Sequence, residues 1–372
     1  MEQRTMAVMD HLGDLEDPRS HINQRHDLHD ILFLTVAAIM SGAEGWKDIK
    51  EFGDAKLAWL RQFRGFEAGI PVDDTIARVI SALVPAQFLD CFVSWVNELR
   101  AADGKDVLAV DGKALRRSHD GNRTSALHRV SVWSCKNRLV LGQSRSVGKK
   151  NEIETVMALL ELIELQGATV TLDAMSCQRK IAKKIVGKRA DYVISLKSNQ
   201  GNLHRQVKAY FAHTHREAPE LIKAGQTETT DGDHGRVEVR RYRQLAITDW
   251  LDEAQGWAGA SSVIEVERER HVGEGVTTQT QYYLSSLAVD PVQAAETIRS
   301  HWGVENQVHW VLDVTFKEDE CRIRRHHGAE NMAMVRRFCM NLARLNTTKN
   351  SMRGKLKNAG WNDAFRAELL FG

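Results

Sequence analysis

The strongest constraint on the fold is the order of strand-like and helix-like segments between residues 107 and 213. Apolar and polar residues alternate in three successive runs, "VLAVDGK", "HRVSVWSC" and "LVLGQSRSV", which predict strands. Helical and strand patterns then alternate through "NEIETVMALLELIEL", "GATVTLDAM", "CQRKIAKKIVG", "ADYVISLK" and "NLHRQVKAYFAH". This order predicts an α/β fold in which three strands form an antiparallel meander and later strands cross over onto the same sheet.

Helical patterns precede this region, and both strands and helices follow it. The first hundred residues predict helices in "HDLHDILFLTVAAIMSGAEGW", "WKDIKEFGDAKLAWLRQF", "VDDTIARVISALV" and "PAQFLDCFVSWVNELR". Asp73 or Asp74 is available as an N-cap, and Pro85 fits a first helical turn. We expect a helical region over 1–103, a core over 104–224 and 288–346, and a β-rich insertion over 225–287. We assign little structure to a basic tail over 347–372.

The composition is typical of a globular protein, with 42% hydrophobic and 27% charged residues in a chain of 372. We find no run of about 18 apolar residues that would span a membrane. The first twenty residues have no apolar signal-peptide core. The five cysteines include no C-x-x-C pair, which favours buried thiols over disulfides or a zinc site. We therefore expect a cytoplasmic protein without membrane contact.

The net charge of +2 conceals three basic blocks. Residues 111–150 contain ten Lys or Arg against two acids, residues 176–208 nine against one, and residues 322–357 ten against one. A solvated helix face usually interleaves both signs. The blocks therefore favour a surface for a polyanion, and we prefer nucleic-acid binding over a merely solvated surface.

Two predicted strands run into aspartates, Asp111 and Asp173. Asp111 stands before Gly112, so a plain Asp-Gly turn is one explanation. Alternatively, two carboxylates at the tips of neighbouring strands repel each other unless a cation lies between them. Mg²⁺ prefers such oxygen ligands, and a magnesium site beside basic blocks suits phosphodiester chemistry.

A third carboxylate is available at Glu305 in "HWGVENQVHW". Helical spacing places it near Ala295, Ile298 and Trp302, the stripe expected to face the sheet, where an unpaired charge is costly. A Glu near a helix end that reaches solvent explains the same residue equally well. His301 and His309 flank Glu305 and could form a zinc site with it. We disfavour zinc because these histidines are eight residues apart, whereas the two histidines of the zinc helix motif H-E-x-x-H are four apart. Cys177 lacks an evident base and is interpreted as a packing residue.

The order Asp, Asp and Glu after a β-rich insertion resembles the DDE transposases. The segments "LAVDGKALRRS", "TLDAMSCQ", "DYVISLKSNQGNL", "DHGRVEVRR" and "HWGVENQVHWVLDVTFKEDECRIRR" resemble the H-repeat-associated branch of insertion-sequence transposases. "GIPVDDTIARVISAL" resembles the N-terminal region associated with that branch. The resemblance extends roughly from His11 to Leu345.

The resemblance implies a ribonuclease-H-like core in which Asp111, Asp173 and Glu305 hold two Mg²⁺, with Mn²⁺ as a substitute. It implies hydrolysis of double-stranded DNA at the terminal inverted repeats, followed by transfer of the 3′-OH to target DNA. The helical N-terminus and the insertion would position the DNA ends, and a homodimer would assemble on them. Nucleoid association follows from the DNA substrate.

Eight basic residues are the candidates for DNA contact: Lys113, Arg116, Arg117, Lys197, Arg236, Arg299, Arg322 and Arg324. The strand "HGRVEVRR" could equally face solvent. Relatives with a β insertion often carry Tyr, Arg and Lys around the third acid, but this chain has Ile298, His301 and Leu312 there. Two alternatives remain open: a nuclease without strand transfer, and a domesticated DNA-binding protein that has lost transposition.

Overall fold

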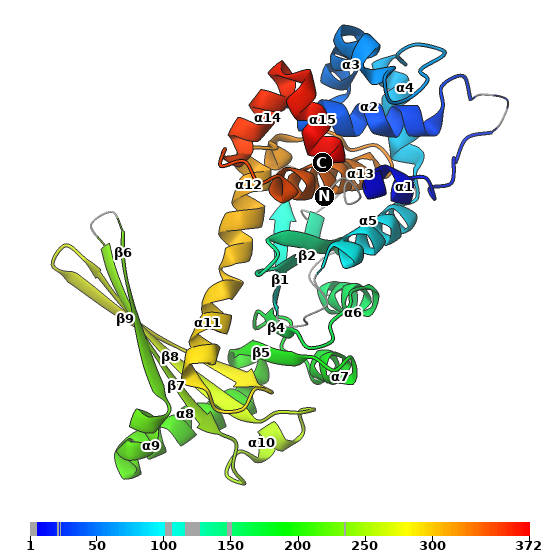
Figure 1. The fold of residues 1–372 in the computed structure, drawn as a ribbon. Helices are drawn as coiled ribbons and strands as arrows, with labels where there is room; N and C mark the ends of the chain where they lie inside the picture. The colour runs from blue at the N-terminus through cyan, green and yellow to red at the C-terminus, as the bar shows by residue number, and fades with distance from the viewer. Residues whose placement is uncertain are drawn as a thin grey trace.

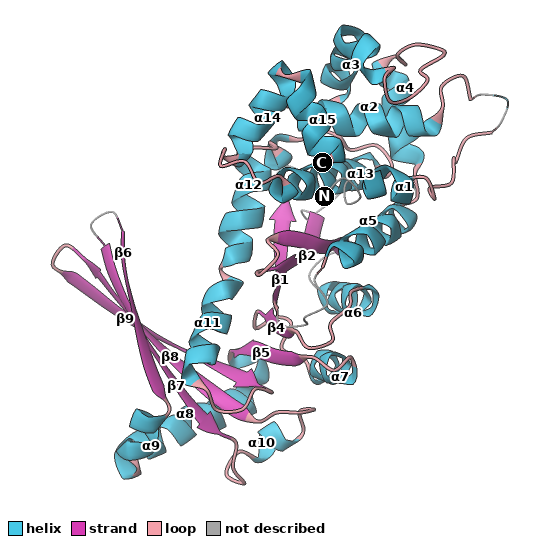
Figure 2. Cartoon of the chain, viewed as in Figure 1, coloured by secondary structure: helices cyan, strands magenta, loops and turns pink. Residues whose placement is uncertain are grey.

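The computed structural model describes residues 6–20, 22, 24–100, 106–115, 127–146, 151–233 and 236–372 (Figure 1). Helices gather at one end of the molecule, a mixed sheet occupies the middle, and long strands project at the other end (Figure 2). The predicted α/β class and helical N-terminal region are confirmed.

The described strands form one nine-stranded sheet in the order β3-β2-β1-β4-β5-β9-β8-β7-β6. The first five are β1 (Val107–Leu115), β2 (Leu127–Ser134), β3 (Leu139–Ser146), β4 (Thr169–Leu172) and β5 (Asp191–Leu196). β1, β2 and β3 pair antiparallel, whereas β4 lies parallel to both β1 and β5. The predicted meander and crossover are thus confirmed.

The strands of the predicted insertion extend this same sheet. They are β6 (Gln226–Asp233), β7 (Arg236–Ala246), β8 (Ser262–Val272) and β9 (Gly275–Ser285). Each pairs antiparallel with its neighbour, and β9 pairs antiparallel with β5. Their far ends project from the body as an arm (Figure 1). Because β9 continues the hydrogen-bonded ladder of β5, the arm is joined directly to the strands that carry the candidate site.

Helices cover both faces of the central strands. α6 (Glu152–Leu162) packs against β2 and β3, α7 (Arg179–Gly187) against β5, and α11 (Pro291–His301) against β1 and β4. Side chains of adjacent strand residues point to opposite faces. Gly112 accordingly lies against the Glu152 carboxylate of α6, while Asp111 faces the chain that follows α11. Three further helices lie beside the arm strands: α8 (Gly201–Glu217), α9 (Pro219–Ala224) and α10 (Asp252–Gln255). α8 contacts β9, α9 contacts β7, and α10 contacts α8.

The helical end combines both ends of the chain (Figure 1). It contains α1 (Met6–Leu12), α2 (Leu28–Met40), α3 (Trp46–Leu60), α4 (Asp73–Ala82), α5 (Pro85–Leu99), α13 (Gly328–Leu345), α14 (Met352–Trp361) and α15 (Asp363–Phe371). α2 is buried over most of its surface because α3, α4, α13, α14 and α15 contact it, which explains its apolar sequence. Pro85 begins α5 as predicted, but the N-cap of α4 is Val72, with both predicted aspartates inside the first turn.

The expectation of little structure in the C-terminal tail is wrong. Ser351 and Asn362 cap α14 and α15 with side-chain hydrogen bonds. Leu369 is buried in the common core, and Arg366 is fully buried with its guanidinium 3.9 Å from the ring centroid of Trp59. A sparse apolar pattern is enough here because both helices pack against the buried helices α2 and α13.

Among the described residues no single helix is long and apolar enough to cross a membrane. α4 and α5 reach that length and composition only when taken together across an 81° bend.

Candidate active site

Asp111 and Asp173 occupy matching positions on neighbouring parallel strands. The ladder between β1 and β4 ends where Val110 pairs with Leu172, and each aspartate is the next residue. Both line a cavity of about 270 Å³. The expectation that β1 ends at Asp111 is wrong, because β1 continues in antiparallel register with β2 to Leu115. The plain Asp-Gly turn is excluded for the same reason.

Gly112 lies against α6 and does not provide space for a substrate. A Cβ at this position would collide with the Glu152 carboxylate, so the glycine makes room for α6 on the opposite face. The missing side chain therefore allows α6 to pack against β1 on the face of the sheet opposite Asp111.

Glu305 lines the same cavity, on a helix that the sequence predicted to be continuous. α11 instead ends at His301, and a π-helical turn, η4 (Glu305–His309), leads into α12 (Trp310–Val314). In this turn Trp310 donates its backbone N–H to the Glu305 carbonyl five residues earlier. Such single π turns occur frequently at functional sites.

The surroundings of Glu305 differ from those inferred by helical spacing. Ala295 and Ile298 are buried as expected, but Trp302 is 54% exposed and Glu305 is also exposed. The interpretation of Glu305 as a carboxylate in an apolar setting is therefore wrong. Its solvent access is consistent with a wall of an open cavity.

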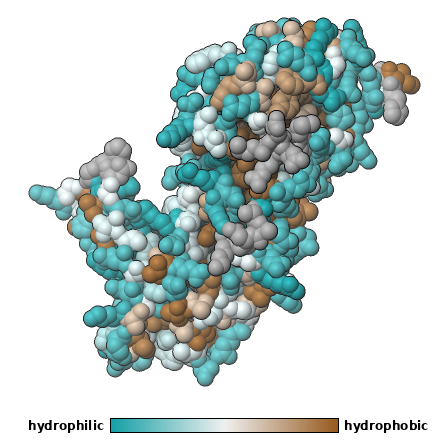
Figure 3. All heavy atoms as spheres, viewed as in Figure 1, coloured by the Kyte–Doolittle hydropathy of each residue, from teal (hydrophilic) through white to brown (hydrophobic). Residues whose placement is uncertain are grey.

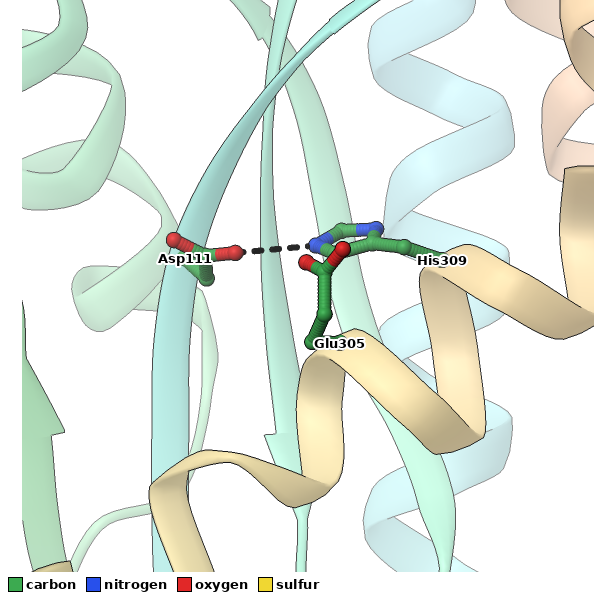
Figure 4. A group of neighbouring side chains, drawn as sticks. All are labelled: Asp111, Glu305 and His309. Atoms are coloured by element: carbon green, nitrogen blue, oxygen red, sulfur yellow. Dashed lines mark hydrogen bonds and ion pairs between the residues drawn. The ribbon is translucent and has the colours of Figure 1, made fainter. Parts of the chain in front are cut away.

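Asp111, Glu305 and His309 each offer one potential metal-ligand atom, and these atoms lie within 4.8 Å of one another (Figure 4). The His309 Nε2 is 3.0 Å from the Asp111 Oδ2, and the Glu305 carboxylate lies beside the imidazole. Burial raises the pKa of Asp111, but the hydrogen bond and electrostatic attraction of His309, together with His301 and the Gly112 N–H, outweigh it and leave this pKa below its usual value. The ionised carboxylates fit a hard divalent cation.

Asp173 lies on the other part of the cavity wall, in a loop fixed by its own hydrogen bonds. Its Oδ1 accepts the Ser176 backbone N–H at 3.0 Å. From the end of β5, the Asn199 amide donates to the Ala174 carbonyl and the Gln200 amide donates to the Cys177 carbonyl at 2.8 Å. The sequence analysis missed these two amides, although a polar "SNQG" directly after a strand was a usable signal.

Cys177 packs beneath this loop as predicted. It is fully buried, and burial raises the pKa of its thiol to about 12. A thiol that remains protonated at neutral pH is not an effective nucleophile.

His301 is a further cavity residue. Its Nδ1 lies 2.9 Å from the Thr171 hydroxyl of β4. Burial lowers the pKa of the imidazole, although Asp111 and Asp173 act in the opposite direction. His301 thus contributes a neutral polar group beside the three carboxylates of the cavity.

The other acids close to Glu305 in the sequence do not line the cavity. Asp313 forms an ion pair with Lys113, and Asp319 lies 3.8 Å from the same ammonium. Glu318, in η5 (Glu318–Glu320), is buried between Arg129 and Arg337. Glu296 is exposed on the outer face of α11.

The predicted DNA contacts fall into several groups. Lys197 is exposed at the cavity, whereas Lys113 is mostly buried against Asp313. Arg116 and Arg117 lie outside the described residues. Arg236 and Arg299 line a second cavity of about 550 Å³ between the arm and α11, where Arg299 also pairs with Asp231 at 2.5 Å.

Arg322 and Arg324 are exposed in the segment before α13. Hydrophilic residues predominate over the arm and much of the face in Figure 3. The third basic block is only partly a surface, because Arg336, Arg337 and Lys355 are buried. Lys355 donates to the carbonyls of Ala343 and Asn346, and Arg337 pairs with Glu318. The structure thus assigns part of that block to internal packing.

Comparison with known proteins identifies the family of this chain. Residues 100–342 match the family described as "Transposase DDE domain", and residues 9–96 match the region described as "DDE_Tnp_1-associated". The chain is 38% identical over 374 residues to "H repeat-associated putative transposase YhhI" of Escherichia coli (strain K12), covering 98% of each. It is 37% identical to "Putative transposase YncI" of Escherichia coli O157:H7, covering 98% of this chain and 94% of that protein.

A shorter relative is named differently. "Inactive transposase YbfQ" of Escherichia coli (strain K12) is 51% identical over 74 residues, which is 20% of this chain. The two family matches together span nearly all of the region from the first helix to α13. This chain therefore belongs to the DDE transposase family, in the branch of the H repeat-associated proteins.

Proposed function

We propose that this chain is the transposase of an insertion sequence. It hydrolyses a phosphodiester bond at each 3′ end of the element and joins the freed 3′-OH to target DNA. The observation that carries the proposal is the meeting of Asp111, Asp173 and Glu305 around one cavity. These residues come from three segments far apart in the sequence, and clustered carboxylates facing a polyanion have no purpose in a simple binding module.

We further infer that the core is ribonuclease-H-like. The order β3-β2-β1-β4-β5, with the first acid on β1 and the second directly after β4, supports this inference. Glu305 follows the arm strands in the sequence. The intervening helix α11 packs against β1 and β4 and so brings the chain back to the central strands.

Asp111, Asp173 and Glu305 are the residues that would hold two Mg²⁺, with Mn²⁺ as a substitute. The metal ions would supply an activated water and neutralise charge on the leaving oxygen. The chain itself contributes orientation. The Ser176 N–H holds Asp173, and the π turn presents Glu305 from α11 toward β1. Lys197 at the cavity rim is placed to meet a phosphate.

DNA ends would run along the exposed basic residues beside these cavities. Arg236 and Arg299 at the second cavity, and the exposed Arg322 and Arg324 before α13, would supply positive charge that positions the duplex without reading its sequence. We propose that the helical end and the arm select the terminal repeats, and that two copies assemble on the paired ends.

The test is incubation of the purified chain with a labelled element end, a target plasmid and Mg²⁺. A transposase gives cleaved ends and joined product, a nuclease gives cleavage alone, and a DNA-binding protein gives neither. Asp111→Asn, Asp173→Asn and Glu305→Gln should each abolish both products while retaining DNA binding. Glu296→Gln, an exposed acid on α11, is the matched control and should retain activity. Cleavage at the unaltered rate in any of the three would refute the site.

A further inference from the structure

His309 lies among the candidate metal ligands, although neither its sequence position nor the family match gives it a role. The imidazole is 3% exposed and sits between α12 and β1. Its Nε2 is 3.0 Å from the Asp111 Oδ2, with the Glu305 carboxylate beside it (Figure 4). Six-coordinate ligands about 2.1 Å from one ion are roughly 3.0 Å apart when adjacent, so this distance fits shared coordination as well as a hydrogen bond.

The other ring nitrogen distinguishes the two possibilities. Nδ1 is buried and has no hydrogen-bond partner within the described part of the chain. A histidine that binds metal through Nε2 carries its proton on Nδ1 and nearly always donates it to an acceptor. Here that proton would be a buried donor without an acceptor, which native structures rarely contain. With the proton on Nε2, the N–H instead meets the Asp111 carboxylate.

We propose that His309 is a positioning residue that donates its Nε2–H to Asp111, restricts the orientation of that carboxylate, and does not itself bind the metal. The proposal rests on the proposed function only in that Asp111 holds a divalent cation. The contact joins two segments 198 residues apart. It therefore fixes the helix that carries Glu305 against the strand that carries Asp111.

The π turn supports this assignment. Glu305 and His309 are its first and last residues, and the hydrogen bond from Trp310 to the Glu305 carbonyl closes it. The two side chains that face Asp111 are thus held by one backbone feature, in which Val308 is buried in the core. A hydrogen bond from His309 adds a cross-link between this turn and β1.

Two measurements on the full chain test the assignment. The first uses protein with ¹⁵N-labelled histidine, in which NMR reports the tautomer of His309 without and with Mg²⁺. We expect the proton on Nε2 in both states. Loss of the Nε2 proton on addition of Mg²⁺ would overturn the proposal, because a coordinated nitrogen carries no proton.

The second measurement is Mn²⁺ binding followed by electron paramagnetic resonance in variants. His309→Leu removes the donor and should weaken Mn²⁺ binding about 10–100-fold, the range for residues that orient metal ligands. His309→Gln restores an N–H donor and should recover most of the affinity, with unchanged ¹⁴N couplings to Mn²⁺. His213→Gln, an exposed histidine on α8, is the matched control.

The possible failures can be told apart. A ¹⁴N coupling of the unaltered chain that disappears in both His309 variants would make His309 a ligand and overturn the proposal. Wild-type affinity in His309→Leu would also overturn it. Unchanged Mn²⁺ binding in Asp111→Asn would instead remove the metal site on which the proposed function depends.

Discussion

Replacing Glu318 by alanine should strongly destabilise the chain, although this residue lies outside the cavity. Glu318 is 2% exposed and accepts hydrogen bonds from Arg129 at 3.0 Å and from the two terminal nitrogens of Arg337 at 2.6 and 3.1 Å. The two guanidinium groups are 4% and 2% exposed. Removing the carboxylate would leave two buried positive charges facing each other.

The magnitude follows from the partners that remain. Removing one member of a buried ion pair costs about 3–5 kcal/mol, because the other charge stays buried. Two cations would be affected, which would increase the cost. However, Arg129 keeps its bond to the Ala329 carbonyl and Arg337 keeps its bond to the Ala333 carbonyl, both at 2.9 Å, which limits it. We therefore expect a loss of about 3–5 kcal/mol, a large share of the 5–15 kcal/mol by which a typical domain is stable.

The assay is urea unfolding followed by tryptophan fluorescence, comparing the unaltered chain with Glu318→Ala. Glu320→Ala is the matched control, because Glu320 is exposed and lies 3.5 Å from Lys317 on the surface. The control should change the free energy of unfolding by less than about 1 kcal/mol. A loss below about 1 kcal/mol in Glu318→Ala would refute the reasoning, since it would mean that the two arginines find water or new partners.

Three further predictions test other contacts. Arg337 and Arg129 outweigh the effect of burial and hold the pKa of Glu318 below its usual 4.5, so this group stabilises the fold above about pH 4.5. That contribution should fall as the pH drops further. Urea midpoints measured from pH 7 to pH 3 should therefore decline less steeply in Glu318→Gln than in the unaltered chain, and equal slopes in the two proteins would contradict this. Gly112→Ala should cost about 1–3 kcal/mol in urea unfolding, because the new methyl group collides with Glu152. Gly201→Ala, whose Cβ would meet nothing within 4 Å, should cost nothing, and equal effects would contradict the packing argument. Ser351→Ala should lose about 1 kcal/mol of stability, because it removes the side-chain cap of α14. Faster amide hydrogen exchange in that helix would report the loss, whereas unchanged exchange would mean that the cap contributes little.

Much of the fold follows from local patterns. The order of strands and helices between residues 107 and 217 and the start of α5 at Pro85 are readable because apolar periodicity and helix-start signals report each element directly. Asp111 and Asp173 could be paired in advance, since parallel neighbouring strands bring equivalent positions together. These properties depend on short-range spacing, which a sequence records in full.

The remaining features depend on contacts between distant segments. β1 continues beyond Asp111 because β2 pairs with it, and α14 and α15 form against surfaces supplied by α2 and α13. The π turn shifts the helix register, so a uniform 100° per residue misplaced the surroundings of Glu305. The environment of charged side chains was the hardest feature to predict. The sequence gives the sign of the charge on Glu318 or Arg337, but it does not give the residue with which each one pairs. Burial of a charge is decided only when the tertiary fold brings an opposite charge to meet it.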